Sequence, residues 1–201
     1  MDMEIYLVRH TTPDVAKGIC YGQADIDVTA TFLAEATIIK QHLPATIVAV
    51  HSSPLQRCKK LAQHLFDGHN IQLHDSLKEV DCGEWELKPW DDIPREEIDA
   101  WVNGLTVRMP NGESYTGLYD RVKDIFLQLH QQAGPIAIVT HGGVIRSILS
   151  HLTNTPLKES FKVFSLHYGC VIKITGTTDN LRHEVLSNIP QEKETHKPSY
   201  L

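Results

Sequence analysis

The sequence predicts an α/β fold: a three-layer α/β/α sandwich with a mostly parallel central sheet. Short apolar runs at residues 5–8, 47–50 and 136–139 are typical of buried strands. In the longer stretches between these runs, apolar residues recur with the helical period. Strands that alternate with helices favour parallel pairing, with helices covering both faces of the sheet.

The first strand, at 5–8, leads directly into Arg9 and His10. It ends before Pro13, because proline cannot donate a hydrogen bond to a strand ladder. The segment that follows is long and irregular, and such segments often carry function.

Helix boundaries are marked by residues that cap or interrupt helices. Thr29, Ser53 and Ser114 are expected to be N-caps, and Pro54 then occupies the first helical position after Ser53. Gly134 interrupts the helix that Ser114 begins. The helices are expected, in order, over about 30–42, 54–65, 94–102, 115–130 and 144–152.

Further short runs in the rest of the chain also indicate strands. These runs lie at 71–74, 161–164, 170–174 and 182–186. Residues 77–86 are rich in acids and are expected to be irregular. Residues 1–190 are expected to form a single domain, and residues 191–201 a polar C-terminal tail.

Composition and charge argue against several classes of function. The net charge is −6 and no apolar run approaches membrane-spanning length, so neither nucleic acid nor membrane is expected as a partner. The N-terminus lacks a signal-peptide pattern and the 4 Cys residues lie far apart, which favours reduced thiols and a cytoplasmic location. The His residues do not show zinc-site spacing, so no metal and no cofactor are expected. The oligomeric state stays open, a homodimer included.

Three polar side chains follow predicted buried strands: His10, Arg57 and His141. Ligands of parallel α/β sheets bind at the carboxyl ends of the strands, so these side chains and Arg9 are expected to converge on one site. Gly142 follows His141 at the start of a predicted helix, where backbone N–H groups favour anions. Two arginines and a charged His141 suit the three equatorial oxygens of a transferring phosphoryl group. The sequence therefore predicts a site that handles phosphate.

Four motifs then identify a family. Residues 9–11 read Arg-His-Thr against a family pattern of Arg-His-Gly, and residues 52–57 match Ser-Ser-Pro-Leu-x-Arg. Residues 77–86 match Leu-x-Glu-x-x-x-Gly-x-Trp-Glu, and residues 139–143 match Val-x-His-Gly-Gly. In these motifs and their order the chain resembles the histidine phosphatase superfamily, the phosphoglycerate-mutase-like proteins. The resemblance implies the fold of that family.

The resemblance also implies a role for each motif residue. His10 would be the nucleophile that becomes phosphohistidine, while Arg9, Arg57 and His141 would bind the phosphoryl oxygens. Glu79 would donate a proton to the leaving oxygen and later help to activate water. Residue type alone leaves Asp81 and Glu84 open as alternative acids; the family motif selects Glu79.

Thr11 departs from the family pattern, which has glycine after the nucleophile. Its hydroxyl is expected to reach the phosphate. Its β-branch opposes a positive φ, so the loop is expected to differ locally from that of the mutases.

One loop points to a subfamily. Residues 8–12 and 18–25 look like the α-ribazole-phosphate phosphatases of cobalamin nucleotide-loop assembly. That resemblance implies α-ribazole 5′-phosphate as the substrate. Tyr21 is then expected to stack on a planar ring, Gly22 to border the site, and Gln23 to hydrogen-bond a ribose or a base edge.

Other interpretations stay open at this point. Tyr21 alternatively only packs its loop against the domain, while Trp85, Trp90 and Trp101 are candidates for the opposite wall of the site. The chain is alternatively a phosphatase of another small phosphomonoester, or a phosphoglycerate mutase. A third interpretation is an inactive phosphoryl-binding protein of the same fold.

Overall fold

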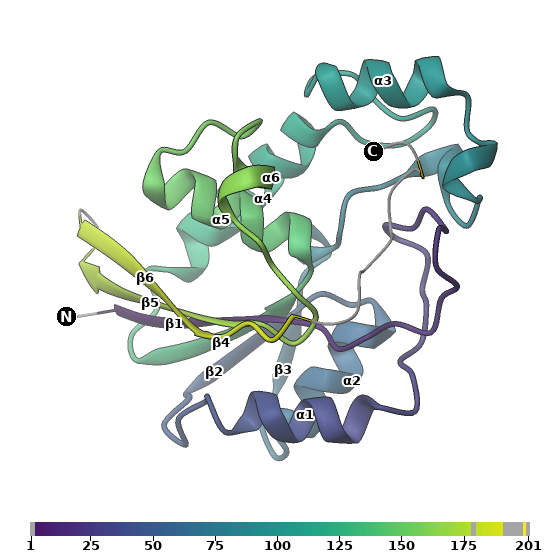
Figure 1. Cartoon of the computed structure of the whole chain (residues 1–201). Helices are drawn as coiled ribbons and strands as arrows, with labels where there is room; N and C mark the ends of the chain where they lie inside the picture. The colour runs from purple at the N-terminus through teal and green to yellow at the C-terminus, as the bar shows by residue number, and fades with distance from the viewer. Residues whose placement is uncertain (1–2, 178–179, 191–198, 200–201) are drawn as a thin grey trace.

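The computed structural model describes residues 3–177, 180–190 and 199. The strands are β1 (Met3–Arg9), β2 (Ala49–Ser52), β3 (Ile71–Leu73), β4 (Pro135–Thr140), β5 (Val171–Thr177) and β6 (Asn180–Ser187). They form one sheet in the order β3-β2-β4-β1-β5-β6 (Figure 1). The first four strands of that order pair in parallel, whereas β5 is antiparallel to both β1 and β6. The predicted mostly parallel sheet is confirmed.

Helices cover both faces of this sheet. They are α1 (Phe32–Lys40), α2 (Gln56–Leu65), α4 (Tyr115–Leu129), α5 (Gly142–Thr153) and α6 (Ser160–Val163). Figure 1 shows α4, α5 and α6 on one face and α1 and α2 on the other. Alternate residues of β1 serve the two cores, since Ile5 and Leu7 pack on the α4 and α5 side while Tyr6 and Val8 pack on the α1 and α2 side. The predicted three-layer sandwich is confirmed.

A third hydrophobic core lies between residues 80–112, here called the cap, and Cys20 of the loop after β1. The cap contains the helix α3 (Arg95–Asn103) and the 3₁₀ turns η2 (Gly83–Trp85) and η3 (Trp90–Asp92), and the turn η1 (Asp75–Leu77) precedes it. The buried residues of this core are Cys20, Cys82, Trp85, Trp90, Ile93, Ile98 and Met109. A β-bridge between Ile19 and Pro89 ties the loop after β1 to the cap. The cap lies beyond the carboxyl ends of the strands (Figure 1).

The strand register brings the ends of three strands level. Arg9 at the end of β1 pairs with Thr140 at the end of β4, and Ser52 at the end of β2 pairs with Val139. Residues that directly follow these strands therefore meet at one edge of the sheet, beneath the cap.

One predicted strand is wrong. The run 161–164 forms most of α6, and Phe161 and Val163 are exposed. Pro156 begins a turn in which its carbonyl accepts from the Ser160 N–H. A four-residue alternation of apolar and polar residues cannot separate a strand from one helical turn.

Several helix boundaries in the structure differ by a few residues from the predicted ones. α2 begins at Gln56 with Leu55 as its N-cap, and the Ser53 hydroxyl accepts only a long hydrogen bond of 3.4 Å from the Leu55 N–H. α5 begins at Gly142, earlier than predicted. Ser114 is confirmed as the N-cap of α4, since its Oγ accepts from the Gly117 N–H.

The predicted tail, residues 191–201, lies outside the described residues apart from Ser199. The single domain over residues 1–190 stays a prediction. Within the part of the chain that the structure describes, no helix has the length and apolar character needed to cross a bilayer.

A pair of histidines, one buried and one half-buried, links β2 to the chain beyond β3. His51 is completely buried, and its Nδ1 lies 3.0 Å from Nε2 of His74 while its Nε2 lies 3.1 Å from Oε1 of Gln132. The amide oxygen accepts, so His51 donates from Nε2 and accepts at Nδ1. Burial lowers the pKa of both imidazoles, and the facing His74 lowers the pKa of His51 further.

We expect the protein to lose stability as the pH falls below about 6.5, the ordinary histidine pKa that applies in the unfolded chain. The folded state keeps His51 and His74 neutral, so the unfolded state binds more protons in this range. The stabilisation is complete above that pH and declines below it. A loss of about 1 kcal/mol would lower Tm by about 2–4 °C in a protein of this size.

Thermal denaturation between pH 8 and pH 5 tests this expectation. His51→Gln should flatten the decline in Tm, whereas His64→Gln, at an exposed histidine, should leave its slope unchanged. A Tm in the wild type that is constant or rises towards pH 5 contradicts the expectation.

Candidate active site

A cavity of about 310 Å³ lies where the cap meets the carboxyl edge of the sheet. Its walls are Arg9, His10, Tyr21, Arg57, Glu79, Val80, Cys82, Trp90, Trp101, Tyr115, Gly142, Gly143, Arg146, Phe161, Leu166 and Tyr168. It therefore gathers residues from the end of β1, the cap, and the helices α2, α4, α5 and α6, while His141 does not line it.

His10 follows β1 directly and is almost fully buried. Its Nδ1 lies 2.7 Å from the carbonyl oxygen of Thr11. A carbonyl only accepts, so Nδ1 carries the proton and donates, and the neutral ring then has its lone pair on Nε2. The ring packs 5.1 Å from that of His141 and 5.4 Å from that of Tyr168, measured between centroids. The backbone thus sets the tautomer that a nucleophilic Nε2 requires.

Arg9 lies beside His10 at the end of β1. Its Nη1 donates to the Leu166 carbonyl at 2.5 Å, and its guanidinium carbon lies 4.1 Å from the Tyr168 ring centroid. A Cβ on Gly142 would lie 3.3 Å from Nε of Arg9, so glycine leaves the guanidinium room at the start of α5.

Arg57 comes from the first turn of α2 and is completely buried. It donates from Nη1 to the Ala24 carbonyl at 2.8 Å and from Nη2 to the Gly22 carbonyl at 2.6 Å. Its Nε has no hydrogen-bond partner among the described residues. A buried N–H without a partner is costly, so this group is well suited to an anionic ligand.

His141 is the N-cap residue of α5 and is also completely buried. Its Nε2 lies 2.8 Å from Oγ of Ser53 and 3.4 Å from Sγ of Cys58. Burial raises the pKa of the Cys58 thiol to about 12, so this neighbour carries no charge.

The structure favours a neutral His141 over the expected charged one. Burial lowers the pKa of His141 well below its usual range, and the nearby cations Arg57 and Arg9 lower it further. A neutral imidazole still offers one N–H to a phosphoryl oxygen. The two arginines therefore carry the fixed positive charge of the site.

Glu79 supplies the carboxylate of the cavity. Its Oε2 accepts from the Gly143 N–H at 2.9 Å, and its Oε1 accepts from its neighbour Val80 at 2.9 Å. A Cβ on Gly143 would lie 2.2 Å from Oε1, so this approach requires a glycine in the first turn of α5. The bond ties the acidic segment to the helix that follows His141.

The two alternative acids do not line the cavity. Oδ1 of Asp81 accepts from the Gly83 N–H at 2.9 Å, and Glu84 is exposed and accepts from Asn111. Among the described residues, Glu79 is the acid on the cavity wall. This geometry favours Glu79 as the proton donor.

The predicted substrate-binding residues divide into two groups. Tyr21 and Gly142 line the cavity, whereas Thr11, Gly22 and Gln23 do not. The Gln23 side chain donates to the Glu79 carbonyl at 3.1 Å, and the Gly22 carbonyl accepts from Arg57. Gly22 and Gln23 therefore support Arg57 and Glu79 from behind the wall, and direct contact with substrate stays a prediction for them.

Thr11 is buried beneath the loop, and its hydroxyl has no hydrogen-bond partner among the described residues. Non-glycine residues with positive φ in the described chain are Leu87, Asn111 and Asn154, so Thr11 avoids the conformation that its β-branch opposes. Contact between its hydroxyl and a phosphate stays a prediction.

Sequence reasoning missed several residues of the cavity. Tyr168 precedes β5 and shares a hydrogen bond of 2.6 Å between its hydroxyl and that of Tyr21. Tyr115, Arg146 and Phe161 form the wall on the side of α4, α5 and α6. Arg146 lies one helical turn after Gly143. This spacing from the His-Gly-Gly motif could have predicted that Arg146 lies at the site.

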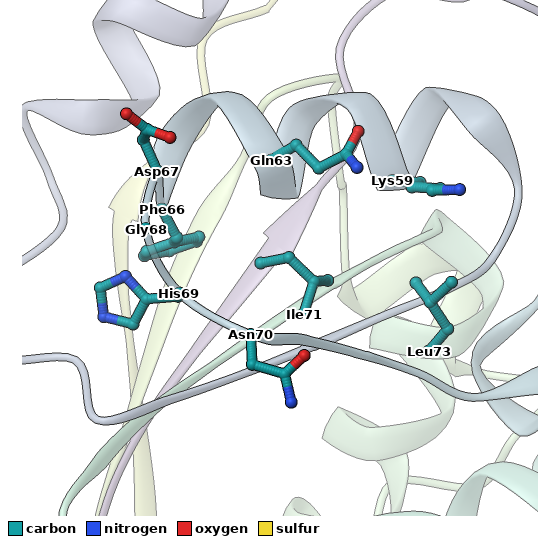
Figure 2. A pocket seen from close by; sticks show the side chains of 9 residues that line it. All are labelled: Lys59, Gln63, Phe66, Asp67, Gly68, His69, Asn70, Ile71 and Leu73. Atoms are coloured by element: carbon teal, nitrogen blue, oxygen red, sulfur yellow. The ribbon is translucent and has the colours of Figure 1, made fainter.

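Another hollow, of about 440 Å³, lies between α2 and the edge strand β3 (Figure 2). Its charged side chains are Lys59, in the first turn of α2, and Asp67, just beyond the C-terminus of that helix (Figure 2). None of the predicted site residues lines it. The cavity under the cap is therefore the candidate active site.

The site as a whole suits a phosphoryl group. His10 presents a nitrogen lone pair, and Arg9 and Arg57 supply positive charge. The carboxyl group of Glu79 lines the same cavity. Within the described residues, no cluster of three or more His, Cys, Asp or Glu side chains is arranged to hold a metal ion. Fold and site together define an α/β protein with a cationic pocket suited to a phosphoryl group.

Comparison with known proteins places the chain in a family. A model of the histidine phosphatase superfamily (branch 1) matches residues 5–189. The chain belongs to the histidine phosphatase superfamily.

Three similar proteins illustrate the range of its relatives. The solved α-ribazole phosphatase from Shigella flexneri has a TM-score of 0.84 at 25% identity, over 95% of this chain and 100% of that one. A metal-independent phosphoserine phosphatase from Arabidopsis thaliana is 32% identical over 75% of this chain and 68% of its own length. A 6-phosphofructo-2-kinase/fructose-2,6-bisphosphatase from the same plant is 25% identical over 77% of this chain. The match covers only 22% of the length of that protein.

Proposed function

We propose that this chain is a phosphomonoesterase that works through a phosphohistidine on His10. The observation that carries the proposal is the hydrogen bond from Nδ1 of His10 to the Thr11 carbonyl. It leaves the lone pair on Nε2, in a cavity that also holds the guanidinium groups of Arg9 and Arg57.

In the first step, Nε2 of His10 attacks phosphorus and the bond from phosphorus to the leaving oxygen breaks. Arg9 and Arg57 stabilise the charge on the equatorial oxygens, and His141 donates its one N–H. Glu79 gives its proton to the leaving oxygen, so the alcohol departs neutral.

In the second step, the oxygen of a water molecule attacks phosphorus and the bond between phosphorus and Nε2 breaks. The carboxylate of Glu79 takes the proton of that water, which restores the acid for the next cycle. Inorganic phosphate leaves and His10 returns to its neutral form.

We further propose α-ribazole 5′-phosphate as the substrate. Tyr21, Trp90 and Trp101 give the cavity aromatic walls, while Trp85 lies behind and packs edge-on against both tryptophans. A flat benzimidazole on a ribose phosphate makes use of such walls. The likeness to a solved α-ribazole phosphatase supports the same substrate.

A second candidate is a phosphomonoester with a further anionic group, such as O-phosphoserine. Nε of Arg146 and the hydroxyl of Tyr115 have no hydrogen-bond partner among the described residues, and both residues line the cavity. The Tyr115 side chain is almost fully buried, and the Arg146 guanidinium lies beside it and 4.8 Å from the Phe161 ring. Nη2 of Arg146 donates to the Phe164 carbonyl at 3.4 Å, and among the described residues this cation has no carboxylate partner, so together with the buried hydroxyl it favours a carboxylate in the ligand. The related phosphoserine phosphatase supports this candidate.

A panel of phosphomonoesters tests the two candidates. We expect kcat/KM to be higher for α-ribazole 5′-phosphate than for O-phosphoserine, 3-phosphoglycerate or a hexose phosphate. Tyr21→Ala should lower kcat/KM for α-ribazole 5′-phosphate by about 10-fold through the lost aromatic contact, in kcat as well as KM. Tyr21→Phe keeps the ring and is the matched control.

The outcomes separate the alternatives. A preference for O-phosphoserine that Arg146→Gln abolishes identifies the second candidate. A preference for 3-phosphoglycerate that Arg146→Gln abolishes also supports the second candidate, whereas a preference for a hexose phosphate removes both candidates but leaves the chemistry at His10 intact. No turnover even of p-nitrophenyl phosphate identifies an inactive phosphoryl-binding protein.

A further inference from the structure

An ion pair behind the cavity holds the segment that carries Glu79. Arg121, on α4, donates from Nε to Oε1 of Glu113 at 2.7 Å and from Nη2 to Oε2 at 2.9 Å. The two side chains are mostly buried, and the pairing is bidentate. Glu113 thus balances the charge of Arg121 and fixes the plane of its guanidinium.

The same guanidinium donates to three backbone carbonyls around Glu79. Nη1 donates to Ser76 at 2.9 Å and to Lys78 at 2.8 Å, and Nη2 donates to Glu79 itself at 2.8 Å. One side chain therefore holds the backbone on the N-terminal side of Glu79 and at Glu79.

Glu113 holds the chain on the other side of Glu79. Its backbone N–H donates to the Asp81 carbonyl at 2.8 Å, and its Oε2 accepts from the Asp81 N–H at 3.2 Å. Residues 76–81 are thus fixed before, at and after Glu79 by a single ion pair.

The pair does not contact the reacting groups. Neither Arg121 nor Glu113 lines the cavity. The Glu79 carboxylate accepts hydrogen bonds from the backbone N–H groups of Val80 and Gly143. The pair can act on the reaction through the position of the Glu79 backbone, and through the charge of Arg121, which also lowers the pKa of His141; Arg121→Lys keeps that charge.

We propose that Arg121 and Glu113 are positioning residues that hold Glu79 at the distance from which it protonates the leaving oxygen. The proposal rests on the acid role of Glu79 in the proposed function. A displacement of about 1 Å at a reacting group is enough to lower a rate by about 100-fold.

Leaving-group dependence tests the proposal. Arg121→Lys keeps the charge but loses the planar fork, and Glu113→Gln removes the charge balance and one strong acceptor. Each should lower kcat/KM for an alkyl phosphate by about 10- to 100-fold and change kcat/KM for p-nitrophenyl phosphate by less than about 3-fold, because kcat/KM reports the first step and p-nitrophenolate leaves in that step without a proton.

Two further variants make the test specific. Arg121→Lys added to Glu79→Gln should cause no additional loss on the alkyl phosphate, since both changes remove the same proton transfer. Arg108→Lys is the matched control, because Arg108 donates to the Gly112 carbonyl in the same region but does not contact residues 76–81. Thermal denaturation checks that each variant is folded.

The possible failures are distinguishable. Equal losses on both substrates in Arg121→Lys and Glu113→Gln, or an additional loss in the Glu79→Gln background, overturn the positioning role while the acid role stands. Equal losses on both substrates in Glu79→Gln itself overturn the acid role and the positioning role together.

Discussion

Replacing His10 with Ala is expected to lower kcat for p-nitrophenyl phosphate by about 10⁴-fold or more, the scale seen when a catalytic nucleophile is removed. Nε2 of His10 is the atom to which the phosphoryl group is transferred, and its tautomer is set by the Thr11 carbonyl. Alanine leaves no nucleophile there, although Arg9 and Arg57 remain. The variant should therefore still bind inorganic phosphate. Steady-state kinetics and calorimetric phosphate titration measure the two properties.

His130→Gln is the control for this substitution. His130 is also buried, but it packs against Phe126 at the end of α4 and does not line the cavity. It should keep nearly full activity. A His10→Ala variant that keeps its activity within about tenfold of the wild type would contradict the assignment of the nucleophile.

Replacing Glu79 with Gln is expected to slow alkyl phosphates by about 10²–10⁴-fold, the usual contribution of a general acid. Glutamine preserves the shape of the side chain and can still accept from the Gly143 N–H, but it cannot donate the proton that an alkoxide needs. Hydrolysis of p-nitrophenyl phosphate should fall far less. The ratio of the two kcat/KM values is the measurement, because kcat/KM reports the first step and excludes the hydrolysis of the phosphohistidine that both substrates share.

Asp81→Asn and Glu84→Gln are the matched controls, since both acids lie off the cavity wall. Neither should change the ratio between the two substrates. Equal losses on both substrates in Glu79→Gln would remove its role as the acid. A selective loss in either control would move the role to that residue.

Local sequence patterns were sufficient to predict the centre of this fold and the groups that meet there. Each strand at the centre of the sheet is a short apolar run, and in parallel strands such runs end at the same edge. Arg9, His10 and His141 directly follow two of those runs, so their convergence could be predicted without coordinates.

The remaining features depend on tertiary contacts that no local pattern records. The direction of β5 depends on its pairing with β1 and β6, and α6 has the same alternating pattern as a strand. The neutral state of His141 follows from complete burial beside cations. In the sequence, Arg121 is indistinguishable from an ordinary polar residue on α4. Its hydrogen bonds to the segment around Glu79 join residues about forty positions apart in the sequence.

The covalent intermediate tests the account most directly. Wild-type protein is incubated with a phosphomonoester labelled in its phosphoryl group, quenched in base, digested and mapped by peptide. We expect label on the peptide that contains His10, stable in base and lost in acid, and no label in His10→Ala. Undiminished label in His10→Ala, or wild-type label that survives acid, would contradict it.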